Sequence, residues 1–191
     1  MMRVVLAGAM AVAFAGSAMA APLAGVVNTS FREPNGDRVL QMSIDIHAAP
    51  ARVWKGFVDE PTLRGWVAPL AHVDLRNGGD IEESYDPKAT LGGGRTIHHR
   101  ILTYLPERLL VLQNISTPPG LPGAEVYPQI VQVVQLEPTA RGGTRVTLSG
   151  SGYAAGEAFD RLYSFFAAGN AEYLKALKAL SESAPAQGDR P

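Results

Sequence analysis

The chain has 191 residues, of which 46% are hydrophobic, and 17 Lys or Arg residues stand against 18 Asp or Glu residues for a formal net charge of −1. No run of basic residues is present, which argues against nucleic-acid binding because that function needs a concentrated basic face. The chain has no cysteine, so neither disulfides nor cysteine-ligated metals are expected.

The first 20 residues have the pattern of a secretory signal peptide. Arg3 is their only charge, an apolar run extends from Val4 to about Gly16, and Ala18-Met19-Ala20 supplies the small residues of a cleavage site. The apolar run is shorter than the ~20 residues that cross a bilayer, so no integral membrane span is expected. We therefore predict cleavage after Ala20 and export of the mature chain, with the periplasm as its location.

The mature chain is expected to form one domain. Removing residues 1–20 leaves 171 of the 191 residues, and a single domain typically has ~100–200. Residues 21–37 are interpreted as an N-terminal lead-in and residues 38–180 as the folded domain. The sequence SESAPAQGDRP at residues 181–191 is polar and contains Pro and Gly, and we predict that it is a disordered tail.

The folded domain begins with a strand that leads into two short helices. Residues 38–47, RVLQMSIDIH, alternate apolar and polar side chains and predict a strand with one buried face. Pro50 fits the first turn of a helix, and Asp59-Glu60-Pro61 begins a second one. The second helix should end before Pro69, because the residue before a proline avoids the helical region.

Six strand-like segments then follow, separated mostly by short turns: AHVDLR, DIEESY, RTIHHRILTY, RLLVLQNIS, QIVQVVQLE and TRVTLSGSGY. Links as short as Asn77-Gly78-Gly79 join antiparallel neighbours, so the segments predict a meander. The exception is the link at residues 117–128, TPPGLPGAEVYP, which is long and rich in Pro and Gly. We expect this link to gate the mouth of a cavity, or else to be an ordinary exposed connection.

The chain closes with a predicted amphipathic helix, GEAFDRLYSFFAAGNAEYLKALKAL. One stripe at helical spacing contains apolar and aromatic side chains and a single amide: Phe159, Leu162, Tyr163, Phe166, Asn170, Tyr173, Leu174, Leu177 and Leu180. This stripe must cover an apolar surface. The order of elements predicts an α+β fold in which a curved antiparallel sheet wraps around a long C-terminal helix, with two short helices after the first strand.

Several stretches carry a resemblance to a known family: IHAAPARVWKGFVDEPTLRGW, VDLRNGGDIEESY, ILTYLPERLLV, VQLEPTARGGTRVTLSGSGY and FFAAGNAEYLKALK. With these stretches the chain resembles the SRPBCC, or START-like, helix-grip superfamily, over roughly residues 38–180. Within it the chain is similar to the polyketide cyclase-like branch named for homologues of the heat-shock-protein ATPase activator. The resemblance implies a helix-grip fold with a cavity between sheet and helix. Members of the superfamily bind lipids, steroids, hormones or polyketides, and some are cyclases.

Alternation along two adjacent predicted strands points Glu83, Tyr85 and His99 toward the inner face of the sheet. A carboxyl near an imidazole shares a proton, holds a polar ligand group or acts as acid and base, whereas the alternative is a hydrogen-bonded core cluster. His98 and His99 are consecutive and should face opposite sides of the sheet. With two other histidines and no cysteine, no metal site is predicted, and no motif for a cofactor is present.

These patterns predict an exported binding protein that holds a small hydrophobic molecule or a lipid between the sheet and the last helix. The residues expected to contact it are Phe57, Trp66, Tyr85, His99, Tyr163, Phe166 and Asn170. Asn170 either reaches the ligand or water, or satisfies a backbone carbonyl. The alternatives are a cyclase- or hydrolase-like enzyme that uses Glu83, Tyr85 and His99, and a module with a filled cavity that acts through its surface on a protein partner.

Overall fold

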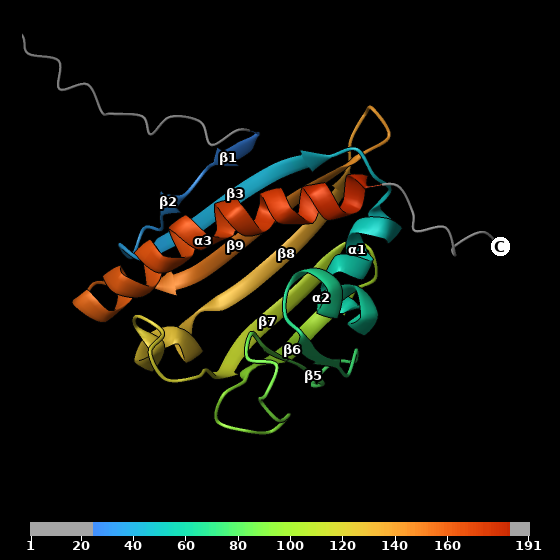
Figure 1. The fold of residues 1–191 in the computed structure, drawn as a ribbon. Helices are drawn as coiled ribbons and strands as arrows, with labels where there is room; N and C mark the ends of the chain where they lie inside the picture. Colours follow the sequence, from blue (N-terminus) through green and yellow to red (C-terminus); the bar gives the residue numbers. More distant parts are fainter. Residues whose placement is uncertain (1–24, 184–191) are drawn as a thin grey trace, which may run out of the picture.

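A computed structural model describes residues 25–183 of the chain (Figure 1). The strands in this range are β1 Val26–Asn28, β2 Phe31–Arg32, β3 Arg38–Ile46, β4 Leu70–Val73, β5 Asp80–Ser84, β6 Ile97–Leu105, β7 Leu109–Ser116, β8 Val131–Pro138 and β9 Thr144–Tyr153. The helices are α1 Pro50–Val58, α2 Glu60–Trp66, the 3₁₀ helix η1 Ala124–Gln129, and α3 Glu157–Glu182. The predicted signal peptide and its cleavage site lie outside the described residues.

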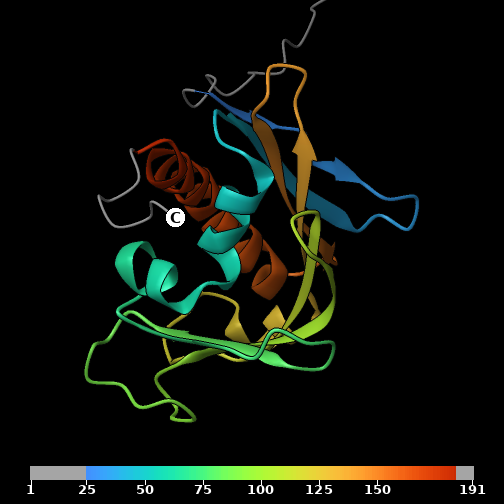
Figure 2. The same cartoon turned by 90° about the vertical axis from the view of Figure 1, so that its right-hand side faces the viewer.

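The strands of this range form one sheet in the order β1-β3-β9-β8-β7-β6-β5-β4, with β2 paired to β3. Every pairing is antiparallel. The sheet curves, and α3 crosses its concave face with α1 and α2 beside it (Figures 1 and 2). This arrangement confirms the predicted α+β fold with a curved antiparallel sheet around a long C-terminal helix.

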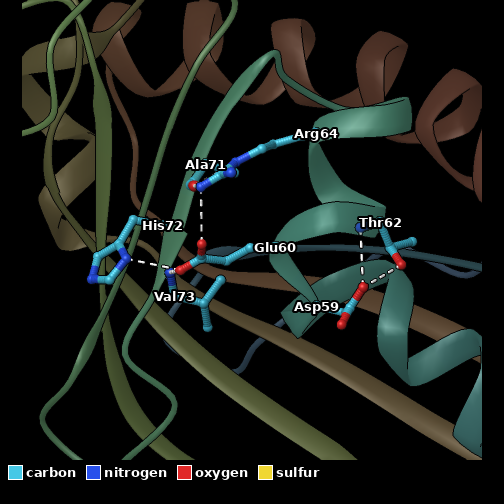
Figure 3. Close-up of polar contacts among 7 residues, drawn as sticks. All are labelled: Asp59, Glu60, Thr62, Arg64, Ala71, His72 and Val73. Carbon is cyan, nitrogen blue, oxygen red and sulfur yellow. Dashed lines mark hydrogen bonds and ion pairs between the residues drawn. The ribbon is translucent and has the colours of Figure 1, made fainter.

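The two short helices form as the sequence predicts, and one aspartate joins them. Pro50 occupies the first turn of α1, where its missing N–H leaves no hydrogen bond unmade. Asp59 ends α1 and caps α2, because its carboxylate accepts hydrogen bonds from the Thr62 backbone N–H at 3.0 Å and from the Thr62 hydroxyl at 2.6 Å (Figure 3). The chain therefore turns sharply between the helices without losing the first N–H groups of α2.

The core lies between α3 and the concave face of the sheet. Leu162, Leu174 and Leu177 of α3 are fully buried, and they pack in one cluster with the inward residues of the sheet, including Leu40, Ile44, Ile46 and Val146. Helix α1 approaches α3 closely at Gly56, where an added Cβ would lie 2.6 Å from a methyl group of Leu177. The buried leucines of the predicted stripe thus pack α3 onto the sheet, which removes their apolar surface from water.

Both ends of the domain extend beyond the boundaries that the sequence suggested. In the predicted lead-in, β1 and β2 add to the edge of the sheet by pairing with β3. Helix α3 includes Ser181 and Glu182, which the sequence assigned to the tail. The Glu182 carboxylate accepts hydrogen bonds from the His47 backbone N–H at 2.7 Å and from the Lys178 side chain at 2.6 Å, and these contacts favour the extra helical residues.

None of the helices within residues 25–183 combines the length and the apolar content that a membrane crossing requires. The rest of the predicted tail, from residue 184, lies outside the described residues.

Candidate functional site

A cavity of about 230 Å³ lies between the sheet and α3. Most of the side chains around it are apolar or aromatic, and a few are polar. The lining comprises Phe57, Leu63, Ile81, Glu83, Tyr85, Ile97, His99, Leu110, Leu112, Thr117, Leu121, Tyr127, Gln132, Val133, Val134, Leu148, Ser149, Gly150, Tyr153, Phe165, Phe166, Asn170 and Tyr173. Since apolar walls with a few converging polar groups are typical of small-molecule sites, this cavity is the candidate site.

Two adjacent strands bring Glu83 and His99 to the same wall. In the pairing of β5 with β6, Ile81 lies opposite His99 and Glu83 lies opposite Ile97. Glu83 and His99 are therefore diagonal neighbours on one face, at the ~7–8 Å spacing of such pairs. The predicted placement of these two side chains on the inner face is confirmed, because both line the cavity.

The Glu83 carboxyl lies half-buried in the cavity wall. It makes no hydrogen bond or ion pair with any residue of the described range. Burial raises the pKa of Glu83 to about 7, because the charged form loses hydration without gaining a partner. Near neutral pH both the neutral acid and the carboxylate are therefore populated, and either form is accessible to a molecule in the cavity.

His99 is 6% exposed, and its Nδ1 atom is buried without a hydrogen-bond partner in the described range. Its ring meets that of Tyr127 edge-on, with the ring centres 5.8 Å apart. Burial, and secondarily a charge on His98, lowers the pKa of His99 to about 4. The imidazole is therefore neutral at neutral pH and does not act as a counter-ion for Glu83.

Tyr85 lies at the rim of the cavity rather than on its buried wall, since 64% of its surface is exposed. The predicted alternation stops before this residue because β5 ends at Ser84. The Ser84 side chain is buried and donates a hydrogen bond to the Arg95 carbonyl oxygen at 2.8 Å. The chain turns away from the sheet at that point, and Tyr85 follows the turn.

The structure brings five of the seven predicted ligand-contacting residues to the cavity: Phe57, Tyr85, His99, Phe166 and Asn170. The Asn170 amide makes no side-chain hydrogen bond within the described range. Asn170 therefore lines the cavity and does not satisfy a backbone carbonyl, which was the second role expected for it from the sequence. Ligand contact itself stays a prediction for all five.

Trp66 and Tyr163 lie outside the cavity lining. The Trp66 indole N–H donates to the Gly56 carbonyl oxygen at 3.0 Å, and its ring packs at 4.8 Å on that of Tyr173. Tyr163 instead packs beneath the Arg38 guanidinium, which lies 4.6 Å from its ring centre. Helical spacing predicts that both side chains face the interior. It does not specify whether their neighbours there belong to the packed core or to the cavity.

Tyr127 and Gln132 are polar residues of the cavity outside the set predicted from the sequence. Tyr127 is buried in η1, where its ring packs at 4.9 Å on Phe166, and the Gln132 side chain donates to its hydroxyl at 2.8 Å. Alternation signals Gln132, because it shares a strand face with the buried Val134. No comparable signal exists for Tyr127, since it follows an irregular loop.

The predicted gate comprises residues 117–128, and its second half, from Gly123 onward, is fixed to α3. Gly123 has a φ of 73°, and a Cβ there would clash with the Ala158 carbonyl oxygen and approach the Leu162 Cβ to 2.8 Å. Arg161 of α3 forms an ion pair with Glu125 at 3.0 Å. Only the segment before Gly123, from which Thr117 and Leu121 line the cavity, is left for gating, and gating stays a prediction for that segment.

A polar network fixes α2, which contributes Leu63 to the cavity wall. The Glu60 carboxylate accepts from the Val73 backbone N–H at 2.9 Å, lies 2.8 Å from His72 Nδ1, and pairs with Arg64 at 2.9 Å (Figure 3). The Val73 N–H is the main reason that the pKa of Glu60 is lowered. These contacts hold α2 against β4 and so close one side of the cavity.

The outer face of the sheet carries the other histidine of the His-His pair. His98 Nε2 lies 3.3 Å from the Asp80 carboxylate, while His99 faces the cavity, so the predicted opposite orientation is confirmed. Within residues 25–183, no group of three or more His, Cys, Asp or Glu side chains is arranged to hold a metal ion.

A curved antiparallel sheet, a long C-terminal helix in its concave face and a cavity between them define a helix-grip protein. The profile of the Activator of Hsp90 ATPase homolog 1-like protein family matches residues 47–182, well over half of the chain. The chain belongs to this family, within the SRPBCC group of helix-grip, polyketide cyclase-like proteins.

Solved structures share the fold at low sequence identity. CalU16 from Micromonospora echinospora is 19% identical with a TM-score of 0.59, over 82% of this chain and 86% of that one. The Aha1 dimer from Colwellia psychrerythraea is 18% identical with a TM-score of 0.59, over 78% and 98% of the two chains. At these identities the likeness concerns the fold alone. No curated protein sequence matches the chain significantly.

Proposed function

We propose that the protein is an exported binding protein that holds a small, largely apolar ligand in the cavity between the sheet and α3. One observation carries this proposal: the cavity is lined mainly by apolar and aromatic side chains, yet the Glu83 carboxyl and the Asn170 amide face it without side-chain partners in the described range. Buried polar groups normally have partners, so these two are suited to fixing the orientation of a bound molecule.

The volume limits the size of the ligand. An apolar cavity of ~150 Å³ holds one benzene molecule, and sites for drug-sized ligands span ~300–1,000 Å³. At about 230 Å³, this cavity fits one substituted ring or a short branched chain. Of the two expected ligand types, a small hydrophobic molecule is therefore favoured over a lipid with long acyl chains.

Export follows from the signal-peptide pattern of residues 1–20 and is part of the proposal. An exported protein would not meet a cytosolic ATPase, so the activity in the family name is not part of the proposed function. N-terminal sequencing of protein from the cell envelope tests export, with Ala21 as the expected first residue. A mature chain that still begins with Met1 would contradict it.

Native mass spectrometry of protein purified from its own envelope fraction tests ligand binding. We expect an added mass that corresponds to one small molecule per chain. Leu112→Phe narrows the cavity from its β7 wall and should remove that mass, whereas the same exchange at the exposed Leu105 should leave it in place. Retention of the mass by Leu112→Phe would locate the molecule elsewhere.

A second candidate function is acid–base catalysis in the same cavity. The pKa of Glu83 is raised to about 7 and that of His99 is lowered to about 4, so Glu83 is poised to exchange protons near neutral pH. With the copurified molecule as substrate, Glu83→Gln should lower turnover by ~10²–10⁴ while binding persists. Absence of any chemical change in that molecule leaves binding as the function.

A further inference from the structure

The cavity lining contains one acidic side chain and no basic counterpart within the described range. Glu83 is the only acidic residue among the lining side chains of the described range, and that lining includes no lysine or arginine. His99 is neutral at neutral pH because burial lowers its pKa to about 4. An ionised Glu83 is thus the one full charge that residues 25–183 contribute to the cavity wall.

Aromatic rings form much of the remaining wall. From the described part of the chain, seven Phe or Tyr side chains line the cavity: Phe57, Tyr85, Tyr127, Tyr153, Phe165, Phe166 and Tyr173. Several are in mutual contact, with ring centres 4.9 Å apart for Tyr127 and Phe166 and 6.3 Å apart for Phe57 and Tyr173. The faces of aromatic rings attract cations through their quadrupoles, most strongly where water is excluded.

The groups near Glu83 come from four elements, and none of them is cationic. Tyr85 follows its own strand, His99 is on β6, Tyr127 on η1 and Tyr173 on α3. The charge of Glu83 raises the pKa of Tyr127 and Tyr173 further, after the larger effect of their burial, so both hydroxyl groups are within its electrostatic reach. Among the cavity-lining residues of the described range, no cation therefore compensates a charge on this carboxyl.

We infer that, if the cavity binds a ligand as proposed above, the ligand is a small organic amine whose ammonium group pairs with Glu83 while its apolar part fills the aromatic cavity. The pairing supplies the positive charge that the wall lacks, and charge-assisted hydrogen bonds are the strongest that a carboxylate forms. A carboxylate or phosphate ligand would instead bring a second negative charge to a wall without a cation, which is unfavourable at short range.

A neutral alcohol of the same shape would contribute one hydrogen bond without relieving the charge on Glu83. The amine is therefore distinguished from the alcohol by electrostatics, and both are distinguished from an anion by sign. Benzylamine, benzyl alcohol and benzoate share one ring and differ mainly in these properties. Each of them has the size that the cavity accommodates.

Isothermal titration calorimetry with these three probes tests the inference. At about pH 8, where Glu83 is mostly ionised, we expect benzylamine to bind about tenfold or more tightly than benzyl alcohol, and benzoate to bind weakest. At about pH 5.5, where Glu83 is mostly protonated, the preference for the amine should shrink severalfold. Glu83→Gln should abolish the preference at both pH values and keep the affinity for benzyl alcohol.

Glu137→Gln makes the same exchange at an exposed position of β8, outside the cavity lining, and should leave all three affinities unchanged. If benzylamine binds no tighter than benzyl alcohol, or if Glu83→Gln keeps the preference, the amine inference is wrong while the cavity remains a binding site. If none of the probes binds at millimolar concentration to the folded wild-type protein, both the inference and the proposed binding function are overturned.

Discussion

The two halves of α3 face different environments. Residues 171–182 form a packed end, where Ala171, Leu174 and Leu177 are fully buried and Tyr173 alone borders the cavity. Residues 157–170 form a hollow end, where Phe165, Phe166 and Asn170 line the cavity and Leu162 alone is fully buried. One continuous helix thus provides a close-packed core at one end and a binding wall at the other.

This difference indicates where stability and function are separated in the molecule. At the packed end Gly56 of α1 lies close against Leu177, and burial of apolar side chains in such a core is the dominant favourable contribution to folding. The cavity beside the hollow end is lined by the Asn170 amide of α3 and the Glu83 carboxyl of β5, and neither has a side-chain partner in the described range. Local departures from good packing and pairing are typical of functional sites.

The largest effect is expected at the packed end. Leu177→Ala should lower the free energy of unfolding by ~2–5 kcal/mol, because the fully buried side chain leaves a cavity between α1 and α3. Denaturant unfolding measures the change. Leu105→Ala, at an exposed position of β6, is the control and should change stability by less than ~0.5 kcal/mol. Equal effects would show that the packed end is not the main source of stability.

The second prediction concerns the contact between α3 and the link at residues 117–128. Gly123→Ala should destabilise the protein by roughly 2–3 kcal/mol, since it adds strain at positive φ and a clash with the Ala158 carbonyl oxygen. Gly120→Ala is the matched control: its φ of 97° is equally left-handed, but open space surrounds the new Cβ. It should cost about 1 kcal/mol. Equal losses would mean that the loop is not fixed to α3 at Gly123.

The third prediction concerns Glu83 and has the opposite sign. Its pKa is about 7 in the folded protein, whereas 4.5 is the ordinary value for a glutamate and applies to the unfolded chain. The folded state therefore binds the carboxyl proton more tightly. The stability due to this group is full below pH 4.5 and is lost as the pH rises toward about 7. Glu83→Gln should therefore be more stable than wild type by ~1–3 kcal/mol at pH 8 and equally stable near pH 4.

The difference in unfolding free energy between wild type and Glu83→Gln at each pH isolates the effect of Glu83 from that of His99. The lowered pKa of His99 has the opposite effect on the pH dependence of stability. Stability due to the neutral His99 is lost as the pH falls from 6.5 to about 4, and this loss occurs in both proteins. Thermal unfolding across this range gives the comparison. A difference between wild type and Glu83→Gln that does not vary with pH would show that the Glu83 carboxyl is well hydrated.

The sequence predicts the regular part of the fold well. Alternation over residues 38–47, the prolines that begin α1 and α2, and the apolar stripe of α3 each reflect a local rule that the tertiary structure agrees with. The first turn of α2 even follows from the Asp59-Glu60-Pro61 sequence alone. The strands of the lead-in were missed because β1 and β2 are three and two residues long, too short for a periodic signal.

The cavity is predicted less completely, because its lining depends on how elements cross. Glu83 and His99 follow from strand alternation, since neighbouring strands keep their register. Trp66 and Tyr163 fail as lining residues because the pattern within one helix does not specify its packing partner. Tyr127 comes from η1, whose position depends on contacts of Gly123 and Arg161 with other parts of the chain.

Phe166 distinguishes the two ends by comparison with Leu177. Although Phe→Ala changes in a full core cost ~3–5 kcal/mol, Phe166 is half-buried and borders a cavity, so Phe166→Ala should cost only ~1–2 kcal/mol. Binding of benzyl alcohol should weaken, because the ring that packs on Tyr127 is part of the wall. A loss of stability above ~3 kcal/mol in denaturant unfolding would show that this end is packed as tightly as the other.

The smallest effect is expected for the ion pairs at the surface of the hollow end. Arg161 pairs with Glu125 at 3.0 Å and with Glu157 at 2.8 Å, and about half or more of each side chain is exposed. Exposed pairs contribute ~0–1 kcal/mol, so Arg161→Ala should lower the free energy of unfolding by less than 1 kcal/mol. The effect should diminish further in high salt, because screening weakens exposed pairs. A larger loss than that of Gly123→Ala would mean that charge, rather than the close backbone contact at Gly123, holds η1 against α3.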